Sequence, residues 1–537
     1  MTGTTVDFIV VGAGSAGCVL ANRLSEGGKY SVCLFEAGQR DRNIWIHIPI
    51  GYGKTMFHET LNWRFYTDPD AGMLGREIYW PRGRTLGGSS SINGLIYMRG
   101  QKQDYDHWVE LGNPGWGWDD CLPYFRKLEN NDLGPGPTRG TSGPLNATSI
   151  KTRHPLVEAL VEAGVHLGLP RRDDFNTGDN EGIGYSQLTT RNGRRCSTAV
   201  AYLNPARRRP NLRIETDAHV TRVLFEGTRA TGVTYHKGGQ EHRLLAGREV
   251  ILAAGALQSP QLLQLSGVGP APLLQEFGIP VVYDAPGVGA NLQDHLQLRL
   301  IYEVTQPITT NDQLRTLWGQ AKIGMQWLFL RGGPLAIGIN QGSGFFKIMP
   351  ESDRPDVQLH FGTLSADLAG GDVHEFSGCT YSMCQLRPES RGHVKIKSTH
   401  ALDAPSIQPN YLSTDFDRRT AVAEIRYARK LAATAPLSDL MKREFRPGPD
   451  VESDDEILHF CKEYGATIFH PAGTAKMGPA SDRAAVVDNR LQVHGIQGLR
   501  VVDGSVMPTL NSGNTNVPIV MIAERASDFI REDATAD

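Results

Sequence analysis

Two side chains near the end of the sequence could support proton-transfer chemistry. His470 lies in the stretch TIFHPAGTAKMG, and Asn514 lies in SGNTNVP. An imidazole with an unperturbed pKa of about 6.5 accepts a proton at neutral pH, and a neighbouring amide can orient an oxygen by hydrogen bonding. Local sequence alone favours packing for His470, since a histidine beside a turn is usually structural, and an ordinary helix N-cap for Asn514. The surrounding elements decide how these residues are interpreted.

A glycine-rich turn near the N-terminus predicts a dinucleotide-binding site. Gly12, Gly14 and Gly17 form G-x-G-x-x-G directly after an apolar run and at the start of a helical pattern. The next apolar run ends at Glu36, whose carboxylate suits a ribose diol. This context predicts a βαβ unit whose helix N-terminus binds a pyrophosphate. The fingerprint itself leaves NAD and FAD open.

The whole pattern predicts an α/β fold, α+β overall. A Rossmann-like domain is expected to be interleaved with a second domain built on an antiparallel sheet flanked by helices. The nucleotide-binding domain is assigned to residues 1–156, 211–297 and 464–537, and the substrate-binding domain to 157–210 and 298–463. Buried strands are predicted at 6–11, 30–35 and 498–503, half-buried strands at 356–362 and 393–398, a strand–turn–helix unit at 248–263, and helices at 15–25 and 518–530.

Further motifs identify a resemblance to a known family. Residues 83–100 read GRTLGGSSSINGLIYMRG and residues 255–269 read GALQSPQLLQLSGVG. Together with the N-terminal fingerprint, HPAGTAKMG and SGNTNVPIVMIAE, they closely resemble the signatures of the glucose–methanol–choline (GMC) oxidoreductases. The motifs keep the family order over nearly the whole chain. The branch that looks most similar is that of the choline-dehydrogenase-like alcohol dehydrogenases.

The resemblance implies FAD as the cofactor. Residues of the 83–100 motif would line the pyrophosphate and the flavin, Val220 would meet the adenine, and Asp503 would bind the ribityl chain. Ile92 occupies the position at which some family members carry a histidine that binds FAD covalently, so non-covalent FAD is expected. The predicted cofactor-binding residues are Gly12, Gly14, Ser15, Ala16, Gly17, Glu36, Ala37, Arg84, Gly87, Gly88, Ser89, Asn93, Gly94, Val220, Ala254, Gly255, Asp503, Gly504, Asn514 and Thr515.

The resemblance also implies a reaction. His470 would be the general base that takes the hydroxyl proton of a primary alcohol while hydride leaves for flavin N5, and Asn514 would hold the substrate oxygen. The product would be an aldehyde, and a quinone-type acceptor is favoured over O2. The alternatives are an alcohol oxidase, a choline dehydrogenase, a hydroxynitrile lyase, a light-driven decarboxylase, and a flavin-binding module without catalysis. The other histidines, among them His295 and His494, are expected to have no catalytic role.

The substrate is expected to be neutral, with an aliphatic or aromatic body. Residues 335–350 contain no acidic side chain where the choline branch usually carries a glutamate, and Gln341 and Gly342 stand there instead. A cationic ammonium would need such a partner in addition to aromatic rings. The predicted pocket residues, each of which could also be core, are Trp63, Phe345, Phe346 and Phe469.

Bulk properties exclude several classes of function. A formal net charge of -3 gives no electrostatic basis for nucleic-acid binding. The seven cysteines are scattered without a CxxC, which argues against a disulfide scaffold or a zinc site, and no metal is expected. No secretory signal is recognised, and a cytoplasmic monomer or homodimer is expected. The amphiphilic segment 314–330 is interpreted as a core or lid helix, with peripheral membrane association left open.

Overall fold

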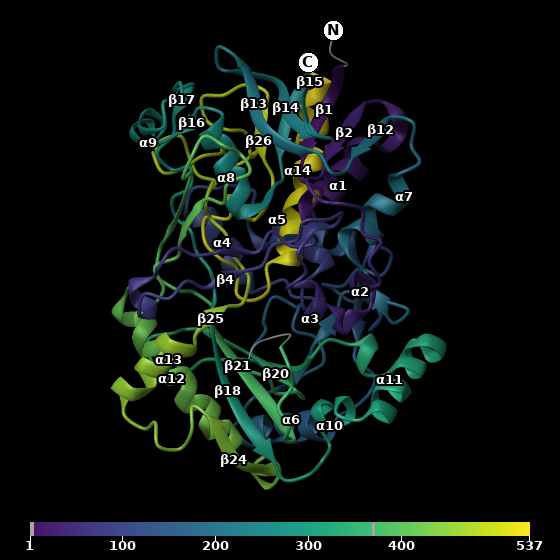
Figure 1. The fold of residues 1–537 in the computed structure, drawn as a ribbon, viewed down its shortest axis with the longest axis vertical. Helices are drawn as coiled ribbons and strands as arrows, with labels where there is room; N and C mark the ends of the chain where they lie inside the picture. The colour runs from purple at the N-terminus through teal and green to yellow at the C-terminus, as the bar shows by residue number, and fades with distance from the viewer. Residues whose placement is uncertain (1–4, 368–370, 537) are drawn as a thin grey trace.

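Two β-sheets dominate opposite ends of an elongated molecule (Figure 1). The structure is a computed structural model that describes residues 5–367 and 371–536. The upper sheet has the order β12 (Leu212–Glu215), β2 (Val32–Phe35), β1 (Thr5–Val11), β15 (Gln240–Leu252), β14 (Arg229–Lys237) and β13 (His219–Glu226), with β26 (Leu499–Val501) paired to β15. The lower sheet has the order β24 (Met441–Arg446), β18 (Leu296–Val304), β21 (Gly378–Gln385), β20 (Val357–Gly362), β19 (Asn340–Phe346), β8 (Gly182–Tyr185) and β7 (Arg171–Arg172), with β25 (Ala466–Thr467) on β18.

The upper sheet is the predicted Rossmann-like unit. Strands β12, β2, β1, β15 and β26 run parallel, because apolar strands buried on both faces alternate with covering helices. Helix α1 (Ser15–Leu24) connects β1 to β2, and α8 (Gly255–Leu265) follows β15, as the sequence predicts. The long helix α14 (Asn516–Ala536) packs against both α1 and α5 (Trp118–Leu128). The remaining helices of this end and the middle are α2 (Ile44–His47), α3 (Tyr52–Thr55), α4 (Lys102–Glu110), α7 (Asn204–Ala206) and α9 (Ala271–Glu276).

The lower sheet is antiparallel except where β7 joins β8. Its helices are α6 (Pro155–His166), α10 (Thr310–Leu314), α11 (Leu317–Leu330), α12 (Asp415–Ala432) and α13 (Asp454–Tyr464). Helix α12 packs on β18 and β21 and covers their apolar face. Side chains alternate along β20, as the sequence predicts, but every residue of β20 is buried. The prediction of a half-buried strand is wrong there because the polar face of the sheet lies inside the molecule, against the upper domain.

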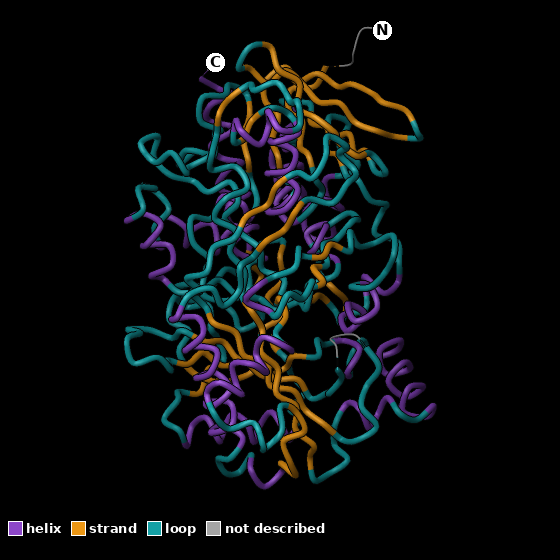
Figure 2. Tube along the Cα trace, turned by 60° about the vertical axis from the view of Figure 1, so that its left-hand side comes forward, coloured by secondary structure: helices purple, strands orange, loops and turns teal. Residues whose placement is uncertain are grey.

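Short sheets accompany the two large ones, and Figure 2 shows the strands after rotation. They pair β3 (Phe65–Tyr66) with β4 (Tyr79–Trp80), β10 (Thr190–Arg191) with β11 (Arg194–Arg195), β16 (Val268–Gly269) with β17 (Tyr283–Asp284), β22 (His393–Lys395) with β23 (Ser406–Gln408), and β6 (Leu145–Ser149) with β5 (Glu129–Asn131) and β9 (Gln187–Leu188). Elements of the two large sheets alternate along the chain, so the domains are interleaved. The residue ranges assigned to them above stay a prediction.

Helix α11 lies at the outer edge of the lower end (Figure 1). It is apolar around most of its circumference, yet only Ile323 and Trp327 are buried. Trp318 and Phe329 are 74% and 75% exposed. The interpretation of this segment as a core helix is therefore wrong. Among the described residues, no helix combines the length and apolarity needed to cross a bilayer.

All seven cysteines are buried free thiols, as expected from their scattered positions. Burial raises the pKa of Cys18 and of Cys33 to about 12, which keeps both thiols protonated and unreactive at neutral pH. Within residues 5–367 and 371–536, no three His, Cys, Asp or Glu side chains are grouped as metal ligands would be. These thiols therefore contribute to packing rather than to chemistry.

Candidate active site

The first cavity lies at the carboxyl ends of the parallel strands of the upper sheet. It encloses about 1140 Å³ that no protein atom fills. The predicted cofactor residues that line it are Gly12, Gly14, Ser15, Ala16, Glu36, Ala37, Gly88, Ser89, Val220, Ala254, Gly255, Asp503, Gly504 and Thr515. Gly17, Arg84 and Gly87 do not line it, whereas Asn93, Gly94 and Asn514 line a second cavity below. Ligands bind at this edge of open α/β sheets because helix N-termini converge there.

Gly17 and Gly14 of the glycine turn are explained by two different constraints, one from packing and one from the cavity. A Cβ on Gly17 would lie 1.8 Å from the carbonyl oxygen of Gly12, so only glycine lets α1 pack against the turn. A Cβ on Gly14 would meet nothing closer than Ala253, at 4.0 Å. Protein packing therefore does not require glycine at position 14, where the backbone faces the cavity. This is what close approach of a ligand to the turn would require.

Two carboxylates border this cavity in different ways. One Glu36 oxygen accepts the backbone N–H of Ala13 at 3.1 Å, and the other accepts that of Gly38 at 2.8 Å. Each oxygen keeps an acceptor position free, which suits the predicted contact with a diol. Burial, opposed by these two bonds and by Arg84, raises the pKa of Glu36 to about 7.

Asp503, the other carboxylate, already has four hydrogen bonds within the protein. It accepts the N–H of Gly255, the hydroxyl of Ser259, and both the N–H and the hydroxyl of Ser505, over 2.6 to 2.8 Å. Four bonds fill the acceptor capacity of a carboxylate. Within the described residues, Asp503 therefore links the start of α8 to the segment that follows β26. The predicted bond to a ribityl hydroxyl would require Asp503 to give up one of these four hydrogen bonds.

A second cavity adjoins the first and encloses about 1340 Å³. Both cavities are bordered by the same five residues, Ser15, Arg82, Ser89, Thr515 and Ile519. His470 and Asn514 lie on its wall, so the structure brings the two predicted catalytic side chains together. The Asn514 amide nitrogen is 3.2 Å from Nε2 of His470.

A chain of hydrogen bonds fixes which nitrogen of His470 is free. Nε2 of His295 lies 3.0 Å from the carbonyl oxygen of Leu386, which can only accept, so this nitrogen carries a hydrogen. Burial lowers the pKa of His295 to about 4, so the ring is neutral and its Nδ1 accepts. Nδ1 of His470 lies 3.0 Å from that atom and must donate to it. Nε2 of His470 is therefore unprotonated and accepts from Asn514.

His470 itself is held neutral by its surroundings. Burial, followed by repulsion from His295, His360 and Arg82, keeps the pKa of His470 well below its usual value. The Asn514 amide oxygen accepts from the Gln358 amide at 3.3 Å, which directs the amide nitrogen towards His470. An unprotonated Nε2 beside an amide donor is the arrangement that alcohol deprotonation needs.

The backbone before His470 is strained and clamped. Phe469 has a φ of 72°, a left-handed conformation that bulky residues rarely adopt. Its N–H donates to the Thr467 hydroxyl at 2.7 Å, and its carbonyl accepts from Arg82 at 2.7 Å. The N–H of His470 donates to Asp294 at 2.7 Å. These bonds on both sides of the residue set the direction in which the His470 ring points.

Sequence reasoning missed two histidines. His295 was expected to have no catalytic role, and the structure places it in direct contact with His470. His360, on β20, borders the second cavity, and both its ring nitrogens are buried without a partner in the described part of the chain. The segment NLQDH carried a signal in retrospect, because Asp294 and His295 are consecutive and contact the backbone and the ring of His470 respectively.

The structure places the four predicted aromatic pocket residues in three different surroundings. Phe469 lines the second cavity. Trp63 lines the first cavity instead, where the Arg84 guanidinium lies 4.7 Å from its ring centre. Phe345 and Phe346 border neither cavity: both are fully buried in β19, against Phe175 and Tyr427 respectively. Their placement in a substrate pocket is therefore wrong.

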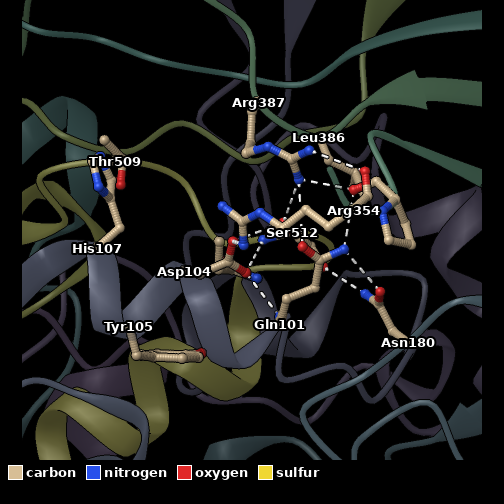
Figure 3. Close-up of polar contacts among 12 residues, drawn as sticks. Gln101, Asp104, Tyr105, His107, Asn180, Arg354, Leu386, Arg387, Thr509 and Ser512 are labelled. Atoms are coloured by element: carbon tan, nitrogen blue, oxygen red, sulfur yellow. Dashed lines mark hydrogen bonds and ion pairs between the residues drawn. The ribbon is translucent and has the colours of Figure 1, made fainter. Parts of the chain in front are cut away.

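A buried polar network supports the loop that carries Asn514 (Figure 3). Asp104, at the start of α4, accepts the N–H of Ser512 at 2.6 Å and its hydroxyl at 2.8 Å, and it pairs with Arg354 at 2.9 Å. Arg387 donates to the same Ser512 hydroxyl at 3.3 Å. Leu386, the residue before Arg387, accepts a hydrogen bond from His295 through its carbonyl oxygen. One segment of the lower domain therefore contacts both the loop that carries Asn514 and the histidine that binds His470.

Comparison with known proteins identifies sequences and structures that are similar to this chain. Two models of the GMC oxidoreductase family match residues 6–297 and 388–523. The mitochondrial choline dehydrogenase of Mus musculus is 44% identical over 531 residues, which cover 98% of this chain and 89% of that protein. The alcohol dehydrogenase [acceptor] of Pseudomonas putida is 43% identical over 528 residues, covering 98% and 95%. The crystal structure of pyridoxine 4-oxidase from Mesorbium loti superposes with a TM-score of 0.88 at 31% identity, over 98% of this chain and 99% of the other.

Proposed function

This chain belongs to the GMC oxidoreductase family, a family of flavoproteins that act on alcohols, and we propose that it oxidises a primary alcohol to an aldehyde with non-covalently bound FAD. The observation that carries the proposal is the unprotonated Nε2 of His470 beside the Asn514 amide donor. These two groups lie in a cavity that adjoins a cradle suited to a dinucleotide. The same proposal makes the second cavity the substrate site.

The residues of the first cavity fit FAD. Gly14, the N-cap of helix α1, provides no side-chain cap, so the first N–H groups of the helix are available to phosphate oxygens. The space beside Gly14 and the free acceptor positions of Glu36 suit a pyrophosphate and a ribose. Ile92, on the wall of the second cavity, has no nucleophilic atom, which supports non-covalent binding. When bound, FAD supplies a hydride acceptor next to the substrate.

The chain's own residues position and deprotonate the alcohol. Asn514 Nδ2 donates to His470 Nε2 at 3.2 Å, and a hydroxyl that replaces this bond can accept from the amide and donate to the imidazole lone pair thus freed. His470 takes the proton at Nε2, while its Nδ1–H stays bonded to His295. Asn514 keeps the oxygen in place as the carbonyl forms. The imidazole that accepts the proton and the amide that donates a hydrogen bond to the substrate oxygen are therefore in place before the substrate enters.

Choline is the main alternative substrate, since relatives include choline dehydrogenases. In the described chain, no aspartate or glutamate lines the second cavity, whereas Arg82 and Arg299 do. A quaternary ammonium would therefore meet positive charge and no counter-ion. This observation supports an alcohol without a cationic group. A second alternative is a hydroxynitrile lyase, which would use the same histidine without redox chemistry. The screen described next distinguishes it from an alcohol oxidoreductase.

An anaerobic screen tests the proposed reaction. Protein loaded with FAD is mixed with choline and with aliphatic, aromatic and polyether alcohols, and the absorbance of the oxidised flavin is followed. We expect bleaching by primary alcohols that lack a cation, stoichiometric aldehyde, and little bleaching by choline. Cleavage of cyanohydrins without bleaching by any alcohol would instead show a lyase. Reoxidation by a soluble quinone that is much faster than by O2 is expected, and rapid peroxide formation would identify an oxidase.

A quinone-type acceptor is supported by the exposed apolar surface of α11. Leu317, Trp318, Phe329 and Leu330 are each at least 74% exposed. Lys322 and Arg331 are exposed on the same segment, and residues 313–350 contain no aspartate or glutamate. Apolar side chains together with basic residues are typical of helices that lie in the interface of anionic bilayers. We therefore propose that α11 attaches the protein to a lipid surface, where lipid-soluble quinones are found.

Replacing Phe329 and Leu330 by serine is expected to weaken binding to anionic phospholipid vesicles by at least about tenfold, because each buried side chain contributes about 1.5–3 kcal/mol. Flotation with vesicles measures this, with Leu402→Ser, another half-exposed leucine, as control. Flavin reduction by soluble alcohols should not change. Equal flotation of wild type and double variant would refute the attachment, and a dimer dissociated by the same changes would assign α11 to contact with a second copy.

A further inference from the structure

The floor of the second cavity is a row of polar side chains on neighbouring strands. Arg299 on β18 is the register partner of Ser382 on β21, and Ser382 is the partner of His360 on β20. All three line the cavity. Adjacent strands are spaced by about 4.8 Å, so Arg299 stands roughly two strand spacings, about 10 Å, from His360. Arg299 therefore lies on the substrate side of the sheet, two strands away from His360.

Arg299 is half-buried, and within the described residues it lacks the partners that a guanidinium drawn away from water normally has. Its only hydrogen bond within residues 5–367 and 371–536 runs from Nη2 to the Ala366 carbonyl, at 3.2 Å. No carboxylate of those residues forms an ion pair with it, and the nearby Asp367 is paired with Arg446 at 2.6 Å. Burial, with repulsion from Arg446, lowers the pKa of Arg299 to about 10, so the group stays charged at neutral pH.

Two other arginines of this protein, in contrast to Arg299, use their guanidinium donors to bind backbone and side-chain oxygens. Arg195, which is 2% exposed, also lacks a carboxylate partner, but it donates to the carbonyls of Ile46, Ser90 and Pro49 and to the side chain of Asn93. Arg82, the other cation of the cavity wall, donates to two carbonyls at 2.6 and 2.7 Å. Within the described residues, only one of the five N–H donors of Arg299 is used, and the side chain lines the second cavity. An uncompensated charge in this position costs stability, which points to a ligand.

We propose that the substrate is an alcohol that also carries a carboxylate, and that Arg299 binds this carboxylate while the hydroxyl reaches His470 and Asn514. The inference rests on the proposed function of the same site. A planar guanidinium with free donors suits the two oxygens of a carboxylate, and no acidic side chain of the described chain lines the cavity to compete for it. Apolar residues of the same cavity wall, such as Leu364 and Ile468, suit a short hydrocarbon body. The neutral alcohol expected from the sequence is replaced by an anionic one.

Matched pairs of alcohols test this assignment in the FAD-loaded protein. The series runs from ω-hydroxybutanoate to ω-hydroxyoctanoate, each beside its methyl ester, and anaerobic flavin reduction gives kcat/KM for each. For at least one chain length we expect the carboxylate to exceed its ester by about 10- to 100-fold, the range for hydrogen bonds to charged groups. Arg299→Met should bring the carboxylate-to-ester ratio of kcat/KM close to one, mainly by raising KM of the carboxylate.

Controls separate the possible failures. Arg299→Lys keeps the charge and should retain part of the preference, whereas Arg222→Met, on the exposed surface of the upper sheet, should change nothing. If esters are oxidised as well as carboxylates and Arg299→Met leaves their ratio unchanged, the carboxylate site is refuted while the proposed reaction stands. If neither carboxylates nor neutral alcohols bleach the flavin, the proposed reaction itself fails.

Discussion

His470→Ala is expected to remain a yellow protein that binds FAD and to lose about 10²–10⁴-fold in the rate of flavin reduction by alcohol. The side chain lines the second cavity and not the first, so cofactor binding should change little. What disappears is the unprotonated Nε2 that accepts the hydroxyl proton. Rapid-mixing measurement of anaerobic flavin bleaching, at saturating alcohol, gives the ratio directly.

The pH profile of the wild type sharpens this test. The pKa of His470 is lowered, so the neutral base is present above that lowered value and is lost only as the pH falls through it. The acid limb of kcat/KM should therefore lie below pH 6.5, the usual value for histidine. His236→Ala, at a half-exposed histidine, serves as control. Near-normal reduction in His470→Ala would remove this residue from the mechanism.

Asp104→Ala should give the largest loss of stability among single changes near the site. It removes a buried carboxylate from Arg354 and leaves two donors of Ser512 and one of Gln101 without their acceptor. Breaking a buried ion pair on one side typically costs about 3–5 kcal/mol. The measurement is the urea midpoint of the FAD-loaded protein, followed by both tryptophan fluorescence and flavin release, because a chain of two domains need not unfold in one step.

Activity distinguishes a supporting role of Asp104 from a merely stabilising one. Ser512 lies two residues before Asn514, so a displaced loop should lower kcat at temperatures where the variant is still folded (Figure 3). Asp104→Asn, which keeps one acceptor oxygen, should recover part of both properties. Asp119→Ala, at an exposed position in the first turn of α5, is the matched control and should leave both unchanged. A variant with normal kcat and a lowered midpoint would confine Asp104 to stability.

Much of the upper domain could be predicted from the sequence because its constraints are local. The glycine turn, the apolar strands and the helices beside them each follow from a short stretch, and the strand, helix and strand predicted for 6–35 appear as β1, α1 and β2. The contact between His470 and Asn514 needed the resemblance to a family, since the residues are 44 positions apart in the chain.

Other features could not be read from the sequence because they depend on distant partners. The contact of His295 with His470 joins residues 175 positions apart, and no local pattern reports it. Phe345 and Phe346 lie on a strand that is buried on both faces, so alternation does not tell which face meets the cavity. Helix α11 is apolar on nearly all sides, and such a pattern predicts burial unless the remainder of the fold leaves it uncovered.

The hydrogen-bond chain from Leu386 through His295 to His470 has a consequence for repeated turnover. Once Nε2 has taken a proton, His470 is an imidazolium with both nitrogens occupied, in a buried site that disfavours positive charge. The proton is thus bound weakly and passes readily to solvent when the product leaves. Each cycle restores the same tautomer, since His295 can accept only from Nδ1. Release of the proton would therefore return the site to the protonation state that the next alcohol needs.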